Sequence, residues 1–348
     1  MTKESYITKL HEIAIQFRGK ELIYCEQAGG GRNSRVYKIF CSDESLYIVK
    51  FYFLDLKDKR KRLENEFSAF QFLWQHGLRN IPQPFLANPA QGYAIYEYIE
   101  GEKIISSEIS EADIDQLVQF LTILRELKKD KKSKVFSLAS EACFSIEGIV
   151  NNLNYRLGRL QAEAKEHLIL RDFLENEYTP FLKEVIDKSK LKVEELGFSW
   201  QDELEKGRRT LSPSDFGFHN ALRRGDSEIT YLDFEYFGWD DPAKMISDFL
   251  LHPGMSLEEK WKQRFAKTIF KNFDQDKLLV NRVKLVYPLF GLKWCLILLN
   301  EFLPEYLQRR GFVAEGPVDK NILEIQMLKT QKMLFKIKIH FQHFPYYD

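Results

Sequence analysis

The sequence has no excess of charge of either sign and no framework of paired cysteines. Its 348 residues include 51 Lys and Arg and 51 Asp and Glu, so no net electrostatic field favours nucleic acid or an acidic membrane surface. The four cysteines are scattered, with no CxxC pair and no histidine at ligand spacing. We therefore expect reduced thiols in a cytoplasmic protein, with neither a zinc site nor disulfide bonds.

The sequence also lacks a secretory leader and an uninterrupted apolar stretch. Residues Met1 to Tyr6 are polar, and no apolar segment typical of a signal peptide follows them. The most hydrophobic run, Leu285 to Leu303, contains Pro288, Lys293 and Glu301. We expect this run to be a buried helix and not a membrane span.

The length is sufficient for two domains, each with its own core. Apolar residues at helical spacing and short β-branched or aromatic runs alternate in residues 1–101, whereas residues 102–348 have a mainly helical pattern. The predicted N-terminal helices are Lys3–Arg18 and Lys57–His76, ending before Gly77, and the predicted strands are Leu22–Ala28, Ser34–Cys41, Leu46–Phe53 and Tyr93–Ile99. This pattern indicates an α+β fold in which the first three strands form an antiparallel meander.

A glycine-rich segment, Gly29 to Tyr37, lies between two predicted strands. Glycine allows backbone amides to approach a polyphosphate closely, and the side chains of Asn33 and Ser34 would add donors. The same residues would also form an ordinary hairpin turn. The segment is neither a Walker loop, because no Gly-Lys-Ser/Thr follows, nor a Rossmann turn, because a strand follows where a helix would be required.

Lys50 ends the otherwise apolar run Tyr47 to Lys50. One interpretation is a lysine on the exposed face of a strand. The other is a lysine that contacts the α- and β-phosphates of a nucleotide and is held by Glu66, which lies in the next predicted helix. Glu64 is a competing partner, but it lies near the opposite side of that helix.

The most specific pattern lies in Leu211–Asn220 and Tyr231–Pro242. Asp215 precedes Asn220 by five residues and Asp233 by eighteen, and a predicted strand places Asp233 at its end. A hydroxyl acceptor requires a carboxylate that orients it and accepts its proton, while Mg²⁺ prefers hard oxygen ligands. The order and spacing therefore predict kinase-type phosphoryl transfer, with Asp215 near the acceptor and Asn220 and Asp233 on magnesium.

Together these segments resemble the aminoglycoside phosphotransferase family, including its choline and ethanolamine kinase relatives. The resemblance covers roughly residues 20 to 255. The residues that carry it are Gly30-Gly31, Asn33 to Tyr37, Lys50, Glu66, Tyr96 to Gly101, Ser214-Asp215, Asn220, Leu232 to Glu235 and Asp241-Pro242. It implies a bilobal protein-kinase-like fold, with a nucleotide-binding lobe in residues 1–101 and a helical lobe with the catalytic and metal-binding loops and the acceptor site in residues 102–348.

The resemblance also implies ATP and Mg²⁺ as cofactors and assigns a role to each site residue. Asp215 is expected to be the catalytic base, and Asn220 and Asp233 the magnesium ligands. Lys50 would contact the ATP phosphates and pair with Glu66, while residues 97–100 would line the adenine. The expected nucleotide-binding residues are Gly30, Gly31, Asn33, Ser34, Lys50, Glu66, Glu97, Tyr98 and Ile99.

Some motif positions depart from the family pattern. The usual His-Gly-Asp, whose histidine mostly braces the loop, is Pro213-Ser214-Asp215 here, and the histidine often found two residues later is Gly217. His219 stands nearby, either as a base beside Asn220 or as a residue that hydrogen-bonds the loop backbone. Asp248 matches a family aspartate that we expect to brace the loop from the next helix.

A small-molecule acceptor is favoured over a protein. No Arg directly precedes Asp215, Asp233 is followed by Phe234-Glu235 in place of the Phe-Gly of a protein kinase, and only seven residues separate Asp233 from Asp241-Pro242, which leaves no room for an activation loop. We expect transfer of the γ-phosphoryl group of ATP to a hydroxyl of a small polar metabolite, with no nucleic-acid or membrane partner. A protein kinase and a nucleotide-binding regulatory pseudoenzyme are the alternatives.

The acceptor class stays open among choline-like amines, aminoglycosides, sugars and nucleosides, as does the oligomeric state. Four acidic residues would suit a cationic acceptor, although surface solvation explains them as well: Glu235, Asp240, Asp241 and Glu301. Three aromatic residues could form the floor of an acceptor pocket or belong to the core: Tyr236, Phe237 and Trp239.

Overall fold

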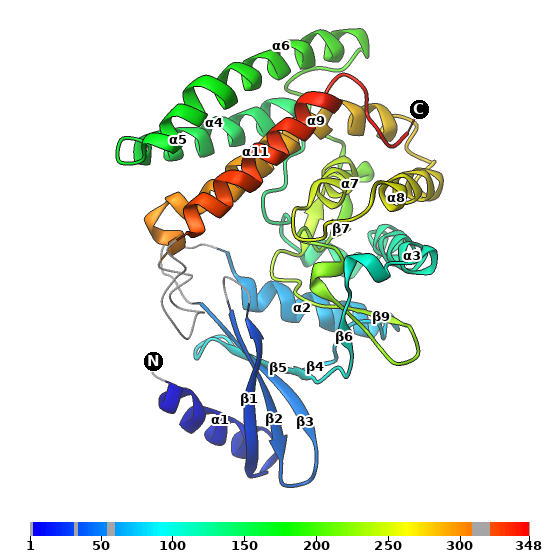
Figure 1. Cartoon of the computed structure of the whole chain (residues 1–348). Helices are drawn as coiled ribbons and strands as arrows, with labels where there is room; N and C mark the ends of the chain where they lie inside the picture. Colours follow the sequence, from blue (N-terminus) through cyan, green and yellow to red (C-terminus); the bar gives the residue numbers. More distant parts are fainter. Residues whose placement is uncertain (1–2, 31–33, 54–59, 308–320, 348) are drawn as a thin grey trace. The chain divides into compact units, whose positions relative to one another are not determined.

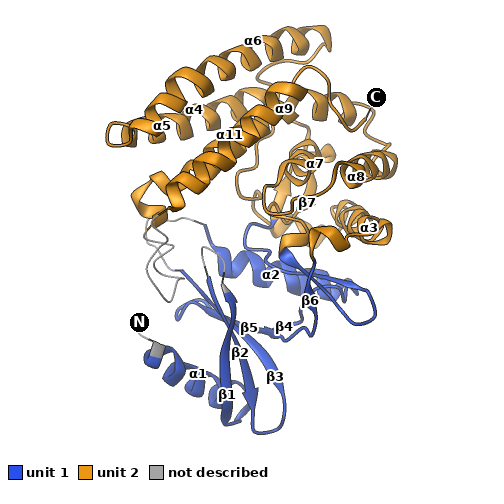
Figure 2. Cartoon of the chain, viewed as in Figure 1, with its two compact units in different colours: residues 1–104, 220–237, 309–317 blue, residues 105–219, 238–308, 318–348 orange. Residues whose placement is uncertain are grey.

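The structure, a computed structural model, describes residues 3–30, 34–53, 60–307 and 321–347 (Figure 1). The chain forms two compact units (Figure 2). The first unit comprises residues 1–104, 220–237 and 309–317, and the second comprises residues 105–219, 238–308 and 318–348. Residues 220–237, which include Asn220 and Asp233, are therefore grouped with the N-terminal sheet, whereas Asp215 belongs to the second unit.

A five-stranded antiparallel sheet in the order β1-β2-β3-β5-β4 forms the centre of the first unit. The strands are β1 (Leu22–Gly30), β2 (Ser34–Cys41), β3 (Leu46–Tyr52), β4 (Pro84–Asn88) and β5 (Tyr93–Glu97). The predicted strands and the β1-β2-β3 meander are confirmed. The sequence pattern does not predict β4 because Pro82 and Pro84 interrupt it, but a proline is tolerated at the first residue of an edge strand.

Two helices accompany this sheet. Helix α1 (Lys3–Arg18) lies as predicted and buries Tyr6, Leu10 and Ile13 in one hydrophobic cluster with strand residues. Helix α2 (Arg62–Gln75) ends where Gly77 adopts a φ of +83°. The amide of Leu78 bonds to the carbonyl of Leu73, and that of Gly77 to that of Trp74, which together form a Schellman motif. The predicted start of α2 at Lys57 lies outside the described residues.

Residues 220–237 form a hairpin that belongs to the first unit. Its strands β8 (Ala221–Arg223) and β9 (Ile229–Tyr231) form a small antiparallel sheet with β6 (Glu102–Lys103), in the order β6-β8-β9. Gly101 precedes this sheet, and a Cβ there would lie 2.8 Å from the carbonyl oxygen of Arg223. After β9, the buried ring of Phe234 packs on Phe70 of α2, with ring centroids 4.9 Å apart.

The second unit is mainly helical, as predicted for the C-terminal part. Its long helices are α3 (Glu111–Leu127), α4 (Ile146–Glu163), α6 (Thr179–Glu195), α7 (Pro242–Leu251), α8 (Glu259–Asn272), α9 (Leu279–Leu298) and α11 (Ile322–His340). Helix α5 (Leu168–Asp172) and a π-helical turn (Phe173–Tyr178) precede α6. Helix α9 contacts α4, α6, α7 and α11, so the core of this unit forms around it.

Shorter elements connect these helices. Strands β7 (Thr210–Ser212) and β10 (Gly238–Asp240) form a two-stranded antiparallel ladder. The ladder fixes the beginning of the Asp215 loop, which follows β7, and of α7, which follows β10. The short 3-10 turns of the chain are Ser106–Glu108, Lys131–Val135, Lys206–Arg208, Phe218–Asn220 and Leu299–Phe302.

Helix α9 and the turn after it, Leu279–Phe302, are long and apolar enough to cross a membrane by length and composition alone. However, 83% of the apolar window is buried inside the protein, which is typical of a core helix. The structure therefore has the buried helix that the interrupting polar residues predict.

The contact between α9 and α11 leaves no room for a side chain at Gly291. A Cβ there would lie 2.6 Å from Cγ1 of Ile337, which is fully buried. We expect Gly291→Ala to lower the free energy of unfolding by about 1–3 kcal/mol through overpacking, measured by urea denaturation.

The matched control is Gly158→Ala in the exposed face of α4, where a Cβ meets nothing within 4 Å. Its greater helix propensity should raise stability by up to about 1 kcal/mol. Equal effects of the two substitutions would contradict the tight packing of α9 against α11.

Candidate active site

Lys50 is the buried cation around which the site in the first unit is built. It lies in β3, the middle strand of the sheet, opposite Val36 of β2 and Ala94 of β5, and only 6% of it is exposed. Its Nζ lies 2.7 Å from Glu66 Oε2 and 2.9 Å from Asp233 Oδ1. A strand lysine so deeply buried requires compensating charge, which excludes the interpretation as a surface lysine.

Glu66 of α2, and not the exposed Glu64, is the partner of Lys50. Its Oε2 also accepts the hydroxyl of Tyr52, and its Oε1 accepts the backbone N–H of Phe234 at 3.1 Å. Both oxygens of Glu66 are therefore occupied, which fixes the carboxylate between the sheet and the segment that carries Asp233.

Asp233 has a left-handed backbone conformation, with φ of 63°. This conformation is uncommon for a residue other than glycine and is typical of functional sites, where neighbouring structure enforces it. The neighbours of Asp233 are indeed fixed: Tyr231 donates its backbone N–H to the carbonyl of Asn80, and Phe234 is fully buried. The Asp233 side chain itself remains 35% exposed, so one carboxylate of the site is accessible.

Glu235 is a third carboxylate on the same lysine, and the sequence pattern does not assign it there. Its Oε1 lies 3.1 Å from Lys50 Nζ, and its Oε2 lies 3.6 Å from Nε of the buried Arg62. We call Lys50, Glu66, Asp233 and Glu235 the Lys50 cluster. Burial raises the pKa of Glu235 to about 7 against the attraction of Lys50, and burial likewise raises the pKa of Glu66.

The Lys50 cluster has more negative than positive charge. Three carboxylates face the side chains of Lys50 and Arg62, and one oxygen from each carboxylate lies within 4.8 Å of the others. The three carboxylates keep the pKa of Lys50 well above its ordinary value although burial opposes this. A group of hard oxygen donors with excess negative charge fits a divalent cation such as Mg²⁺.

Asn220 is held at the same end of the hairpin as Asp233. Ala221 pairs with Tyr231 in the β8-β9 ladder, and the carbonyl of Asn220 accepts the N–H of Leu232 at 2.8 Å. The β8-β9 pairing therefore positions both Asn220 and Asp233. Each of these residues offers an oxygen ligand of the kind that Mg²⁺ prefers.

The other residues predicted to bind nucleotide lie on β1, β2 and β5 or follow β5. Gly30 pairs with Arg35, and the buried Ser34 pairs with Tyr52; Gly31 and Asn33 lie outside the described residues. The carboxylate of Glu97, at the end of β5, accepts the N–H of Gln83 at 3.1 Å. After it, the Tyr98 ring lies 4.3 Å from Lys38 Nζ, and Ile99 is buried.

Asp215 lies in the second unit, on the loop after β7. Its Oδ1 accepts hydrogen bonds from Nε2 of His219 and Nε2 of His252, both at 3.1 Å. Burial alone would raise the pKa of Asp215, but the two histidines outweigh it and hold the pKa well below its ordinary value. The carboxylate is therefore ionised at neutral pH, and 36% of the side chain remains exposed.

Comparison with known proteins identifies the family and the fold of the chain. The chain matches the sequence profile of the phosphotransferase enzyme family over residues 25–274. The chain belongs to this family. No protein of curated function matches it significantly by sequence.

Solved structures with a similar fold include three small-molecule kinases. A choline kinase from Streptococcus pneumoniae is 15% identical, with a TM-score of 0.60 and coverage of 96% of this chain and 100% of that one. A spectinomycin phosphotransferase is 13% identical, with a TM-score of 0.63 and coverage of 96% and 98%. An ethanolamine kinase from Plasmodium vivax is 14% identical, with a TM-score of 0.59 and coverage of 95% and 89%. These likenesses confirm the predicted fold class, and the profile match confirms the family resemblance.

The hydrogen bond of His219 differs from the bond to the loop backbone that the sequence of this phosphotransferase suggested. Its Nε2 bonds to the side chain of Asp215, and not to the loop backbone. His252, which completes the pair, has no recognisable signal in the sequence because it lies at the far end of α7, outside the motif. The two imidazole rings stack with centroids 3.8 Å apart and an interplanar angle of 11°.

Asp248 braces the site through two side chains. Its Oδ2 lies 3.0 Å from Lys244 Nζ, and its Oδ1 accepts the indole N–H of Trp294 at 2.9 Å. Lys244 in turn lies 3.3 Å from the hydroxyl of Ser214, the residue before Asp215. Asp248 therefore reaches the loop through Lys244.

The acidic residues that would suit a cationic acceptor are mostly engaged inside the phosphotransferase. Each is buried and pairs with an internal cation: Glu235 with Lys50, Asp240 with Lys244, and Asp241 with Arg282. These three side chains are therefore neither solvated at the surface nor available to bind a cationic acceptor. Glu301 is also buried.

The three aromatic residues near the motif are divided between the two units. Phe237 is buried and stacks on Phe234, with ring centroids 5.9 Å apart. Trp239 lies in β10 of the second unit, and its indole N–H donates to the carbonyl of Ser133 at 3.2 Å. Tyr236 is half-buried in the first unit and lies near Arg60.

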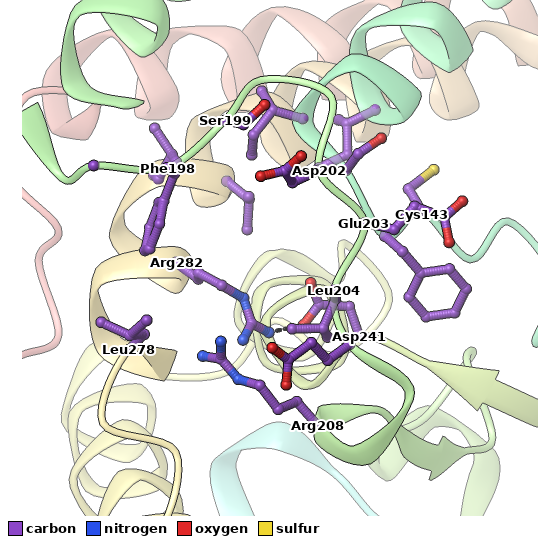
Figure 3. Close-up of a pocket in the computed structure, with 18 residues that line it drawn as sticks. Cys143, Phe198, Ser199, Asp202, Glu203, Leu204, Arg208, Asp241, Leu278 and Arg282 are labelled. Atoms are coloured by element: carbon purple, nitrogen blue, oxygen red, sulfur yellow. Dashed lines mark hydrogen bonds and ion pairs between the residues drawn. The ribbon is translucent and has the colours of Figure 1, made fainter. Parts of the chain in front are cut away.

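A cavity of about 360 Å³ lies in the second unit, between the start of α4, residues 197–208 and α9 (Figure 3). Arg282 of α9 pairs with Asp241 on one side of it, and Asp202 and Glu203 come from the segment before β7. None of the residues predicted for catalysis or metal binding lines this cavity.

The excess of carboxylates in the Lys50 cluster has a measurable consequence for stability. We expect Lys50→Met to lower the free energy of unfolding by about 3–5 kcal/mol, because it leaves buried carboxylates without their cation. The double variant Lys50→Met/Glu235→Gln should lose less than Lys50→Met alone, because one of these charges is gone. Urea denaturation of the double-mutant cycle in EDTA measures the coupling.

The control is Lys20→Met, which removes a half-exposed ion pair with Asp43 and should change stability by no more than about 1 kcal/mol. If the double variant had a lower free energy of unfolding than Lys50→Met, the charge balance inferred for the Lys50 cluster would be wrong.

Proposed function

We propose that this chain is an ATP- and Mg²⁺-dependent phosphotransferase that moves the γ-phosphoryl group to a hydroxyl of a small polar metabolite. The observation that carries the proposal is the Lys50 cluster. In it, Nζ of the strand lysine Lys50 lies 2.7 Å from a carboxylate oxygen of Glu66 in α2 and 2.9 Å from one of Asp233. Membership of the phosphotransferase enzyme family supports it. Structures of three proteins of similar fold contain bound ATP or ADP, which also supports it.

In this proposal the first unit binds the nucleotide. Lys50 contacts the phosphates, and Glu66 keeps its ammonium group in place. The segment from Gly30 to Ser34, with Gly31 and Asn33, provides backbone and side-chain donors for the phosphates. Residues Glu97, Tyr98 and Ile99 line the adenine.

Asn220 and Asp233 are the proposed magnesium ligands. The fit rests on the paired ends of β8 and β9, which hold both residues, and on the excess negative charge of the Lys50 cluster. Magnesium bound there would neutralise phosphate charge. The protein contributes by fixing the neighbours Tyr231 and Phe234 while the Asp233 side chain stays accessible.

Asp215 is the proposed catalytic base and orients the acceptor hydroxyl. A carboxylate whose pKa is held low is a weak base, so its main contribution is to align the acceptor oxygen with the phosphoryl group and to accept its proton as transfer proceeds. This fits phosphoryl transfer, in which positioning and charge stabilisation provide most of the rate enhancement.

The acceptor is proposed to be a small molecule. The segment after Asp233 is short and soon enters β10, which pairs with β7, so no activation loop intervenes. Proteins of similar fold include choline and ethanolamine kinases and aminoglycoside phosphotransferases. Because Glu235, Asp240 and Asp241 are paired internally, neutral sugars and nucleosides are acceptors to be tested alongside amines.

We also propose a cytoplasmic location, where ATP is available. The support is the scattered placement of the four cysteines, Cys25, Cys41, Cys143 and Cys295, without a CxxC pair.

Loss of the Asp215 carboxylate should abolish turnover. We expect Asp215→Ala to lower kcat by a factor on the order of 10²–10⁴ while ATP binding, measured by calorimetry, stays nearly unchanged. ADP release is followed over a panel of amines, aminoglycosides, sugars and nucleosides. The control, Asp226→Asn in the exposed β8-β9 turn, should retain activity, and near-normal turnover by Asp215→Ala would refute the assignment of the base.

Turnover should require a divalent cation. We expect EDTA to abolish ADP release and excess Mg²⁺ to restore it, and Asn220→Ala to raise the Mg²⁺ concentration for half-maximal rate by about tenfold or more. The matched control is Asn176→Ala, at an exposed asparagine of the second unit. Turnover in EDTA would contradict the metal requirement, and ATP binding without turnover of any acceptor would favour a regulatory pseudoenzyme.

A further inference from the structure

The loop that carries Asp215 lacks a donor of its own at the position before Ser214. Pro213 has neither a backbone N–H nor a polar side chain, and Ser214 has a left-handed backbone conformation, with φ of 67°. Two donors reach the Asp215 carboxylate from outside this tripeptide: His219 in the following turn and His252 at the end of α7.

The hydrogen bonds of His252 define its tautomer. The backbone N–H of Gly254 donates to Nδ1 of His252 at 3.1 Å. A backbone N–H can only donate, so Nδ1 must be an acceptor, and the neutral ring then carries its proton on Nε2. Nε2 is the atom 3.1 Å from Asp215 Oδ1, so His252 donates a hydrogen bond to the carboxylate. Burial also lowers the pKa of His252, which favours the neutral ring.

The His252 ring is fixed on both sides. It stacks on His219, and the Trp294 ring meets it edge-on with centroids 4.7 Å apart. Trp294 is held by its hydrogen bond to Asp248, and Asp248 by its ion pair with Lys244.

These contacts form a closed circuit around the loop. Lys244 returns to the hydroxyl of Ser214, the residue next to Asp215, at 3.3 Å. The Ser214 hydroxyl in turn donates to the carbonyl of Ser140 at 3.0 Å. Both the side chain of Asp215 and the backbone that carries it are therefore tied to helices α7 and α9.

We propose that His252 is a positioning residue whose donated hydrogen bond fixes the Asp215 carboxylate for alignment of the acceptor hydroxyl. The inference rests on the proposed function of Asp215. His252 acts through Asp215, so its loss should lower kcat and leave nucleotide binding unchanged, because the groups that bind nucleotide lie in the first unit.

The position of the donor atom allows a sharp test. The terminal amide nitrogen of glutamine extends about as far along the side chain as Nε2 of histidine, whereas that of asparagine corresponds to Nδ1. Phenylalanine keeps an aromatic ring for the stack but has no donor. We therefore compare His252→Phe, His252→Asn and His252→Gln, with His11→Phe at an exposed position of α1 as control.

We expect His252→Phe and His252→Asn to lower kcat by about 10- to 100-fold, the effect of losing one hydrogen bond to a charged group. The KM for ATP should stay within about twofold of the parent enzyme in both variants, because only orientation in the transition state is lost. His252→Gln should recover most of the rate, and His11→Phe should match the parent. Thermal unfolding is measured for every variant. If His252→Phe does not fold, the kcat of His252→Asn tests the inference.

The inference is overturned if a folded His252→Phe or His252→Asn variant keeps kcat within about twofold of the parent. It is also overturned if His252→Gln is as impaired as His252→Phe, since the donor would then be irrelevant. These outcomes leave the proposed function intact when Asp215→Ala is inactive. If Asp215→Ala turns over normally, the proposed role of Asp215 fails, and the role of His252 fails with it.

Discussion

The burial of Lys50 is the constraint on which the rest of the first unit depends. An ammonium group in the middle of a sheet is costly unless carboxylates accompany it. Glu66 reaches it from α2, and Asp233 and Glu235 reach it from the hairpin of residues 220–237. The need to neutralise one lysine therefore explains why a hairpin far along the chain belongs with the N-terminal sheet.

The second unit also contains buried cations that pair with carboxylates, and there they fix one element to another. Lys244 joins Asp240 of β10 to Asp248 within α7, and Arg282 of α9 pairs with Asp241, the N-cap residue of α7. These pairs fix the start of α7 to the ladder from which the Asp215 loop departs. Phosphoryl transfer depends on such positioning, because an acceptor oxygen must be aligned within fractions of an ångström.

The sequence predicts much of this arrangement because the relevant signals are local. Period-two and helical patterns identify β1, β2, β3, α1 and α2, and Gly77 identifies the end of α2 through a conformation that glycine adopts readily. The choice of Glu66 over Glu64 follows from helix geometry alone, since two residues of separation turn a side chain to another face. The order of Asp215, Asn220 and Asp233, downstream of the glycine-rich segment, Lys50 and Glu66, indicates the family, which the match over residues 25–274 confirms.

Only the tertiary structure decides which charged and polar side chains pair across long separations. Glu235, Asp240 and Asp241 look like ordinary surface or substrate-binding acids in the sequence, but each is buried against its own cation. His252 lies outside every motif, yet it bonds to Asp215. Sequence by itself determined most of the elements and indicated the residues proposed for the chemistry, because these depend on local pattern and residue type. The structure decided the partners, because the free energy of a buried charge depends on neighbours that folding brings together.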